Sequence, residues 1–270
     1  YNGEYIDKYM SYTFKFLWKN STECVRRPVL FNNYDHGGIR LVSISSKIKA
    51  FHIYHILSWL FAEEKPKWHS FATYWINRQL GRYYPGLIRN DVCQSFVMSD
   101  FYFSALESFK YYLECVNDLP DTICRVKHIY WKLIDFAAES PRVINIFPRV
   151  DFKIAFSSSL SKFNPPCVRS MNWKIVHDIL PVNVILSRFN ITNNIKCLFC
   201  PAPETISHLF VDCPIGNEIR SKVIELSNIV YGHNIIMNFD TQCVLYNIFS
   251  LQVTKRQKEV ILILINLAKW

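Results

Sequence analysis

Four potential metal ligands lie close together in the chain, at Cys197, Cys200, His208 and Cys213. Written as a spacing, they form the pattern C-x2-C-x7-H-x4-C. The first two thiolates lie on one tight turn, and the last two ligands lie about a turn and a half apart on the short helix expected to follow. Any fold of this chain therefore has to bring a short loop and a helix around one point.

The chemistry of these four side chains indicates zinc. Three thiolates and one imidazole complete a closed tetrahedron, which is typical of a structural Zn²⁺ site and leaves no open position for a catalytic water. We therefore predict one structural zinc ion. The alternative is a set of ordinary reduced cysteines in a core, but chance placement rarely produces this spacing.

The composition indicates a folded and basic chain. Of its 270 residues 50% are hydrophobic and only 7 are glycine, which excludes a disordered, collagen-like or linker-like chain. The formal net charge of +9 favours polyanionic partners such as nucleic acid. The longest apolar stretch, residues 260–268, is too short to span a membrane, so we expect no membrane partner.

Cysteine usage indicates a reducing environment. The chain has 9 cysteines, an odd number, and is too large to depend on disulfides for its core. It opens with no signal peptide and without Met, so we expect a piece of a longer, intracellular chain, found in the cytoplasm and nucleus. In such a compartment, clustered cysteines indicate metal binding.

Apolar periodicity predicts a mainly α fold, with a helical body and a small zinc-binding knuckle. Two short strands are also expected, because the residues after Arg27-Pro28 read as extended and residues 143–156 alternate between apolar and polar. A stretch rich in Ser and Pro at 157–166 is the best boundary candidate. We divide the chain into a helical connector at 1–160, a zinc-binding segment at 161–230 and a C-terminal helical tail at 231–270, which we expect to be truncated.

The residues around the cysteines resemble a known family. The hallmarks are Asn172-Trp173-Lys174, Leu180-Pro181, Leu186-Ser187-Arg188-Phe189-Asn190-Ile191, Cys197-Leu198-Phe199-Cys200, Glu204-Thr205, His208-Leu209-Phe210 and Cys213-Pro214. This block is similar to the zinc-binding segment that follows the reverse transcriptase of LINE-type (non-LTR) retrotransposons. A weaker resemblance upstream, through Phe16-Leu17-Trp18 and Gly37-Gly38-Ile39-Arg40-Leu41, implies a connector just past the polymerase thumb.

The catalytic parts of that family are absent from this sequence. It contains no Asp-Asp pair of the kind that holds two metal ions for nucleotide addition, and no N-terminal endonuclease. Phosphate-binding glycine loops and hydrolase motifs are also absent. We therefore predict that the chain is not an enzyme, whereas its parent polyprotein would be an RNA-directed DNA polymerase.

The resemblance implies nucleic-acid binding, with the segment holding template RNA or target DNA for a polymerase absent from this chain. Lys174, Arg188 and Lys196 are the expected phosphate contacts around the knuckle. Its partners would be RNA or DNA and the polymerase part of the parent polyprotein. The alternative is a helical scaffold that zinc stabilises and that docks other proteins without any affinity for nucleic acid.

Three further features have structural explanations that we favour. His52 and His55 could face one metal, but their apolar surroundings indicate core histidines. Gly37-Gly38 predicts a turn with a positive φ rather than a phosphate loop. Aromatic residues between 68 and 84, with Lys and Arg interleaved, could stack on single-stranded nucleic acid, but such a face is more often core.

Overall fold

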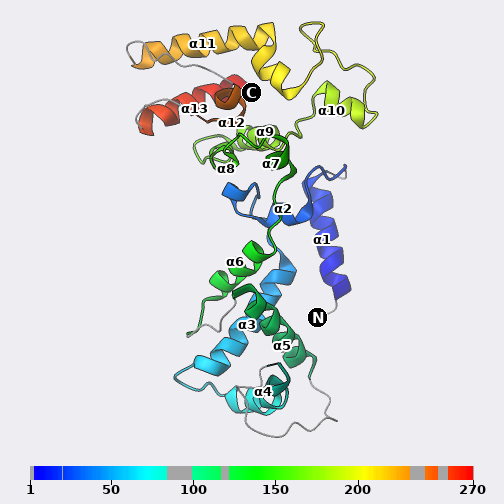
Figure 1. Cartoon of the computed structure of the whole chain (residues 1–270), viewed down its shortest axis with the longest axis vertical. Coiled ribbons are helices and arrows are strands. Elements are labelled where there is room, and N and C mark those ends of the chain that lie inside the picture. The colour runs from blue at the N-terminus through cyan, green and yellow to red at the C-terminus, as the bar shows by residue number, and fades with distance from the viewer. Residues whose placement is uncertain are drawn as a thin grey trace. The chain divides into compact units, whose positions relative to one another are not determined.

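The computed structural model describes residues 3–19, 21–83, 99–116, 122–231, 241–248 and 255–269 (Figure 1). Within these residues every regular element is helical, so the mainly α prediction is confirmed and the two expected strands are wrong. No helix in the described part is long and apolar enough to cross a membrane. The chain forms two compact units, which are described separately: unit 1 (Tyr1–Glu23 and Leu41–Ala138) and unit 2 (Cys24–Arg40 and Glu139–Trp270).

Unit 1 is built around three helices that pack on one another, α3, α5 and α6. Its helices are α1 (Gly3–Leu17), α3 (Ile44–Phe61), α4 (His69–Tyr83), α5 (Asp100–Val116) and α6 (Val126–Phe136). Ser43 is the N-cap of α3, because its side chain accepts a hydrogen bond from the Ser46 amide. The centre of the unit consists of large, fully buried side chains, including Ile53, Leu57, Leu106, Phe109 and Leu133.

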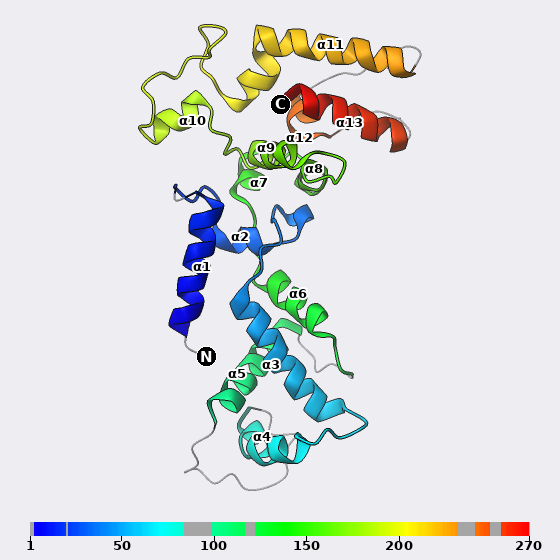
Figure 2. The same cartoon turned by 180° about the vertical axis from the view of Figure 1, so that it is seen from behind.

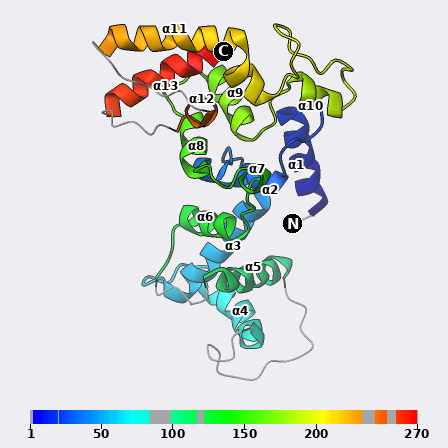
Figure 3. The ribbon, with the colours of Figure 1, turned by 45° about the horizontal axis from the view of Figure 1, so that its top comes forward.

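Unit 2 combines several helices of eight residues or fewer with the long helices α11 and α13 (Figure 2). Its helices are α2 (Arg27–Phe31), η1 (Tyr34–His36), α7 (Arg142–Ile146), α8 (Phe152–Ser159), α9 (Pro166–Val176), α10 (Asn183–Arg188), η2 (His208–Asp212), α11 (Pro214–Tyr231), α12 (Thr241–Tyr246) and α13 (Lys255–Lys269). Helices α8, α9 and α12 pack together, and α13 contacts both α9 and α11 (Figure 3). Their core includes Phe152, Phe156, Val176, Ile206 and Tyr246.

The two segments expected as strands form short helices for local reasons. Pro28 occupies the first turn of α2, where its missing N–H costs no hydrogen bond. Asp151 caps α8, because its carboxylate accepts a hydrogen bond from the Ile154 amide at 3.2 Å. Alternation along residues 143–156 therefore reflects two helical pieces joined through a loop, and their buried residues include Val143 and Phe156.

The Gly37-Gly38 turn joins residues 24–40 to the body of unit 2. Gly37 has φ +80°, as predicted, and its carbonyl accepts hydrogen bonds from Trp173 Nε1 at 3.1 Å and His177 Nε2 at 2.8 Å. A Cβ on Gly38 would collide with the backbone oxygen of Asn32. The second glycine is therefore required by the close approach of two backbone segments.

The division of the chain into a helical connector at 1–160, a zinc-binding segment at 161–230 and a C-terminal helical tail at 231–270 concerns function as well as packing, and it stays a prediction.

Candidate metal centre

The structure brings the four predicted ligands together. Their Sγ and ring-nitrogen atoms all lie within 4.8 Å of one another, with Cys197 Sγ 3.9 Å from Cys213 Sγ and Cys200 Sγ 3.1 Å from His208 Nε2. In tetrahedral zinc sites with Zn–S bonds of about 2.3 Å and Zn–N bonds of about 2.0 Å, neighbouring ligand atoms lie about 3.5–3.8 Å apart. The donor set and its spacing therefore fit a single zinc ion.

The first two ligands lie on a loop that closes on itself. The Cys197 amide donates to the Ala202 carbonyl at 2.8 Å, and the Glu204 amide donates to the Ile195 carbonyl at 2.8 Å. Inside the loop, the Phe199 amide approaches Cys197 Sγ at 3.5 Å. An amide directed at sulfur stabilises the thiolate form, which is the form that binds metal. The loop thus presents two sulfur ligands from a backbone that is already hydrogen-bonded.

The other two ligands lie at either end of a π-helical turn, η2. Thr205 precedes it, and its hydroxyl accepts a hydrogen bond from the His208 amide at 3.0 Å. Five residues of α-helix would place His208 and Cys213 about 140° apart around the axis. The wider turn, closed by the Cys213 amide donating to the His208 carbonyl at 2.8 Å, reduces this angle. The π turn therefore lets an x4 spacing serve one metal, where the sequence predicted an ordinary short helix.

Cys213 directly precedes α11 and occupies its N-cap position. Burial acts to raise the pKa of its thiol, but hydrogen bonds from the Gly216 and Ile215 amides outweigh burial and lower the pKa below its usual value. At Cys197 the balance is reversed, and burial raises the pKa of the thiol. Gly216 permits this geometry, because a Cβ there would lie 2.9 Å from the Leu209 carbonyl oxygen. The start of α11 therefore contributes amides as well as the fourth ligand.

A carboxylate that the metal pattern does not include holds the loop against α10. Glu204 accepts hydrogen bonds from the Asn183 amide at 3.0 Å and from Asn183 Nδ2 at 3.3 Å. Asn183 Nδ2 also donates to the Lys196 carbonyl, one residue before the first ligand, at 2.8 Å. Glu204 belongs to the family hallmarks, but the sequence contains no local signal that pairs it with Asn183.

Comparison with known proteins agrees with this geometry. Residues 149–219 match the family model described as zinc-binding in reverse transcriptase, and this range contains all four clustered ligands. No curated protein matches the chain. The match and the cluster together support a zinc-binding segment from the reverse transcriptase of a retroelement.

The three predicted phosphate contacts lie in different surroundings. Lys196 and Arg188 are exposed, on the ligand loop and at the end of α10 respectively, whereas Lys174 on α9 is half-buried. The Asn183–Lys196 hydrogen bond joins the loop to the start of α10. The charge of Arg188 also acts on Asp178, opposing the rise that burial causes in the pKa of that carboxyl. Arg188 and Lys196 thus belong to one loop–helix assembly, and Lys174 does not face solvent to the same extent.

The remaining sequence candidates are mainly packing residues. His55 stacks on Trp68 with ring centroids 4.2 Å apart, and burial lowers the pKa of both His52 and His55. Trp75 stacks on Tyr102, so its ring face is already covered. Tyr84 and the side chains of Arg78, Arg82 and Tyr83 lie outside the part of the chain that can be described.

Proposed function

We propose that this chain is the nucleic-acid-binding C-terminal segment of a LINE-type retrotransposon polyprotein, and that it holds template RNA or target DNA for the polymerase part. The observation that carries the proposal is the four-ligand cluster inside a match to reverse-transcriptase zinc-binding segments. The net charge of +9 agrees with a polyanionic partner. The parent polyprotein would act in the cytoplasm and the nucleus, where its RNA and DNA partners lie.

The zinc in this proposal is structural. Cys197, Cys200, His208 and Cys213 hold it, and when bound it joins the loop to the start of α11 and contributes folding free energy. The chain itself adds no nucleotides. A polymerase assay with the purified chain, a primed template and Mg²⁺ tests this statement, because measurable incorporation would contradict it.

The side chains proposed to contact phosphates are Arg188, Lys196 and Lys174. The first two are exposed and belong to the assembly of the ligand loop and α10. Metal binding that orders this loop would therefore also fix the position of Lys196. Lys174 has to reach phosphate from a half-buried position, so we expect it to contribute less to binding than the other two.

One observation favours the second candidate, a zinc-stabilised scaffold that docks proteins. Leu198, between the first two ligands, is 83% exposed, and Phe199 and Ile191 are also exposed. Exposed apolar side chains gathered on one loop are typical of protein interfaces. This candidate predicts that the chain has no affinity for RNA or DNA.

Salt dependence separates the two candidates. Binding of a fluorescent RNA or DNA oligonucleotide is measured from low to physiological salt for the wild type, Arg188→Ala, Lys196→Ala and Lys222→Ala. Lys222 is the matched control, because it is an exposed lysine of unit 2 that pairs with Glu225 at 2.9 Å. We expect each test variant to reduce the salt slope by about 1, and the control to leave it unchanged. Absence of binding at low salt would support the scaffold.

A further inference from the structure

Helix α1 has an exposed aromatic face that its packing does not use. Tyr5, Tyr9, Tyr12 and Phe16 are 58% to 87% exposed, and their spacing places them within about 60° of one another around the helix. We call these four residues the aromatic stripe. The opposite face is the covered one, since Phe14 is buried and Ile6, Met10 and Leu17 are half-buried.

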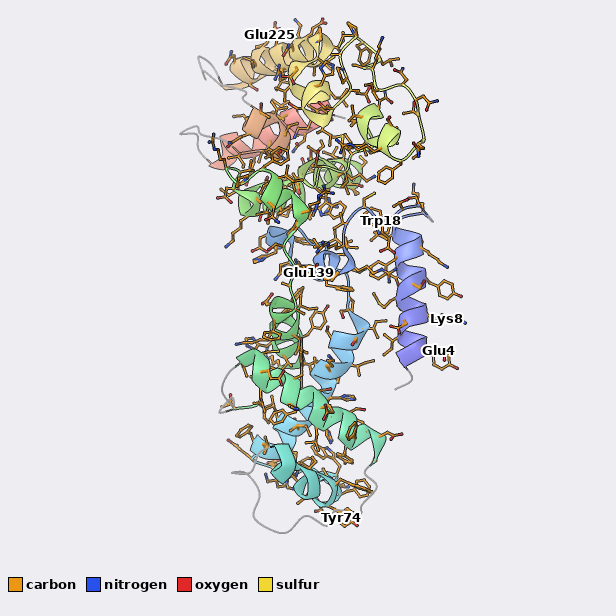
Figure 4. All side chains as sticks on the ribbon, turned by 45° about the vertical axis from the view of Figure 1, so that its right-hand side comes forward. Glu4, Lys8, Trp18, Tyr74, Glu139 and Glu225 are labelled. Carbon is orange, nitrogen blue, oxygen red and sulfur yellow. The ribbon has the colours of Figure 1, made fainter. Side chains whose placement is uncertain are left out.

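Positive charge accompanies the stripe. From Lys8 to Thr22 the chain contains three lysines and no acidic residue. Lys15 Nζ lies 5.8 Å from the centre of the Tyr12 ring, and a cleft of about 650 Å³ is lined by Tyr12, Lys15, Phe16, Leu17 and Lys19. Figure 4 shows the side chains of α1, with Lys8 and Glu4 labelled towards its N-terminal end. The acidic residues of α1, Glu4 and Asp7, both precede this basic part.

We propose that the aromatic stripe and its lysines bind single-stranded nucleic acid, with bases stacked on the rings and phosphates on Lys8, Lys15 and Lys19. This inference rests on the nucleic-acid-binding function proposed above and adds a second surface, in unit 1. Exposed rings interleaved with cations are the combination that proteins use to bind unpaired strands without sequence preference. An apolar protein partner would gain nothing from the three ammonium groups that flank the stripe.

The spacing of the rings favours an unpaired strand over a duplex. Successive rings of the stripe lie about 4.5–6 Å apart along the helix axis. Successive nucleotides of one strand in a duplex rise by about 3.4 Å. Each ring can therefore take a separate base of an extended strand, whereas the stacked bases of a duplex offer no faces to the rings.

The stripe differs in this respect from the aromatic surface of α4. There, Tyr102 stacks on Trp75, and His55 stacks on Trp68, the residue before α4. Among the described residues, none of the four stripe rings stacks on another aromatic ring, and Lys15 lies over the Tyr12 ring. The faces of the stripe rings are thus available for bases.

The test uses the full chain and a labelled 20-nucleotide probe, as single-stranded DNA, as single-stranded RNA and as duplex DNA. The triple variant Tyr9→Leu, Tyr12→Leu, Phe16→Leu keeps apolar area but removes the π faces. The double variant Tyr9→Phe, Tyr12→Phe keeps the rings and is its matched control. We expect the leucine variant to bind both single strands at least about tenfold more weakly, with duplex affinity changed less than about threefold. The phenylalanine variant should stay within about threefold of the wild type.

The outcomes separate this inference from the function on which it rests. Unchanged single-strand affinity in the leucine variant would overturn the proposal that the aromatic stripe binds nucleic acid. Loss of affinity in Arg188→Ala and Lys196→Ala would still support binding by unit 2. No binding of any probe by the wild type would overturn both. Equal loss for single strands and duplex would point to a disturbed fold. Circular dichroism and zinc content identify that case, and the single variant Tyr12→Leu then repeats the comparison.

Discussion

Unit 1 and unit 2 close their cores by different means. In unit 1 the helices α3, α5 and α6 bury their apolar faces against one another. His52 and His55 also pack against neighbouring aromatic rings. In unit 2 the long helix α11 begins directly after the fourth ligand, but the other ligands lie on a loop and a short turn, and two polar connections hold such irregular segments. These connections are the Gly37 carbonyl with its two ring donors and the four-ligand cluster.

The difference shows where potential metal ligands converge. His52 and His55 lie one helical turn apart and could form a metal site, but they contact aromatic rings. Among the residues that the structure describes, no third ligand converges on them. In unit 2 the thiols and imidazole converge because a loop and a π turn are bent towards one point. Cys197 is the one buried side chain in residues 189–205, so apolar packing holds this loop weakly, and we expect a bound metal to contribute to its stability.

Metal removal should have the largest effect and should affect only one unit. The double variant Cys200→Ser, Cys213→Ser, or chelation of the wild type, should destabilise unit 2 by on the order of 5 kcal/mol or more, because structural zinc contributes about 10–16 kcal/mol in small peptides. Hydrogen exchange should accelerate in residues 195–220. Acceleration of the same size in α3 and α5 would contradict the claim that metal stabilises unit 2 alone.

The Gly-Gly turn should be the next most sensitive position. Gly38→Ala should cost unit 2 about 3 kcal/mol or more, because its Cβ would collide with the Asn32 backbone oxygen and neither backbone segment can move cheaply. Gly3→Ala is the matched control in unit 1, since nothing lies within 4 Å of a Cβ there. Urea unfolding of both variants measures the difference. A Gly38 variant as stable as the Gly3 control would contradict the close approach of Gly38 to the Asn32 backbone.

Acid should weaken unit 2 through His177. Its Nε2 donates to Gly37, and burial lowers the pKa of the imidazole from 6.5 to about 4. Between these values the unfolded chain binds a proton that the folded chain does not, so stability falls as the pH falls from 6.5 towards 4, by up to about 3 kcal/mol. His177→Gln keeps a donor but does not titrate, and should lose less stability over this range. Zinc release affects both proteins, so their difference isolates the imidazole.

The stability cost of a small core substitution in unit 1 should not depend on metal. Ile53 is fully buried in α3, and Ile53→Val should cost about 1 kcal/mol by removing one methylene. We expect the same cost with zinc and after chelation, measured by urea unfolding of unit 1. A cost that changes with metal would show that the two units are energetically coupled, which the comparison does not predict.

The sequence predicted the elements that depend on local signals. The body of the chain is helical, as apolar periodicity predicts, and the four cysteine and histidine ligands converge. Both results follow from short-range periodicity and spacing. The positive φ at Gly37 was also predictable, because glycine is the residue that adopts it readily.

The parts that the sequence did not predict depend on contacts between distant residues. Alternation at 143–156 suggested a strand, but the Asp151 cap and packing against α9 and α12 favour helix α8. The π turn at His208 brings the two last ligands to one side of the helix axis, and no pattern in that stretch predicts it. The requirement for Gly38 depends on Asn32 lying beside it, and the Asn183–Glu204 contact joins residues 21 positions apart.

The zinc content of the purified chain tests the central claim most directly. The chain is prepared under reducing conditions, and zinc is measured per chain by inductively coupled plasma mass spectrometry, with the Cys200→Ser, Cys213→Ser variant alongside. We predict one zinc ion in the wild type and none in the variant. A wild type that holds no zinc, or a variant that retains it, would contradict a metal centre at the four ligands.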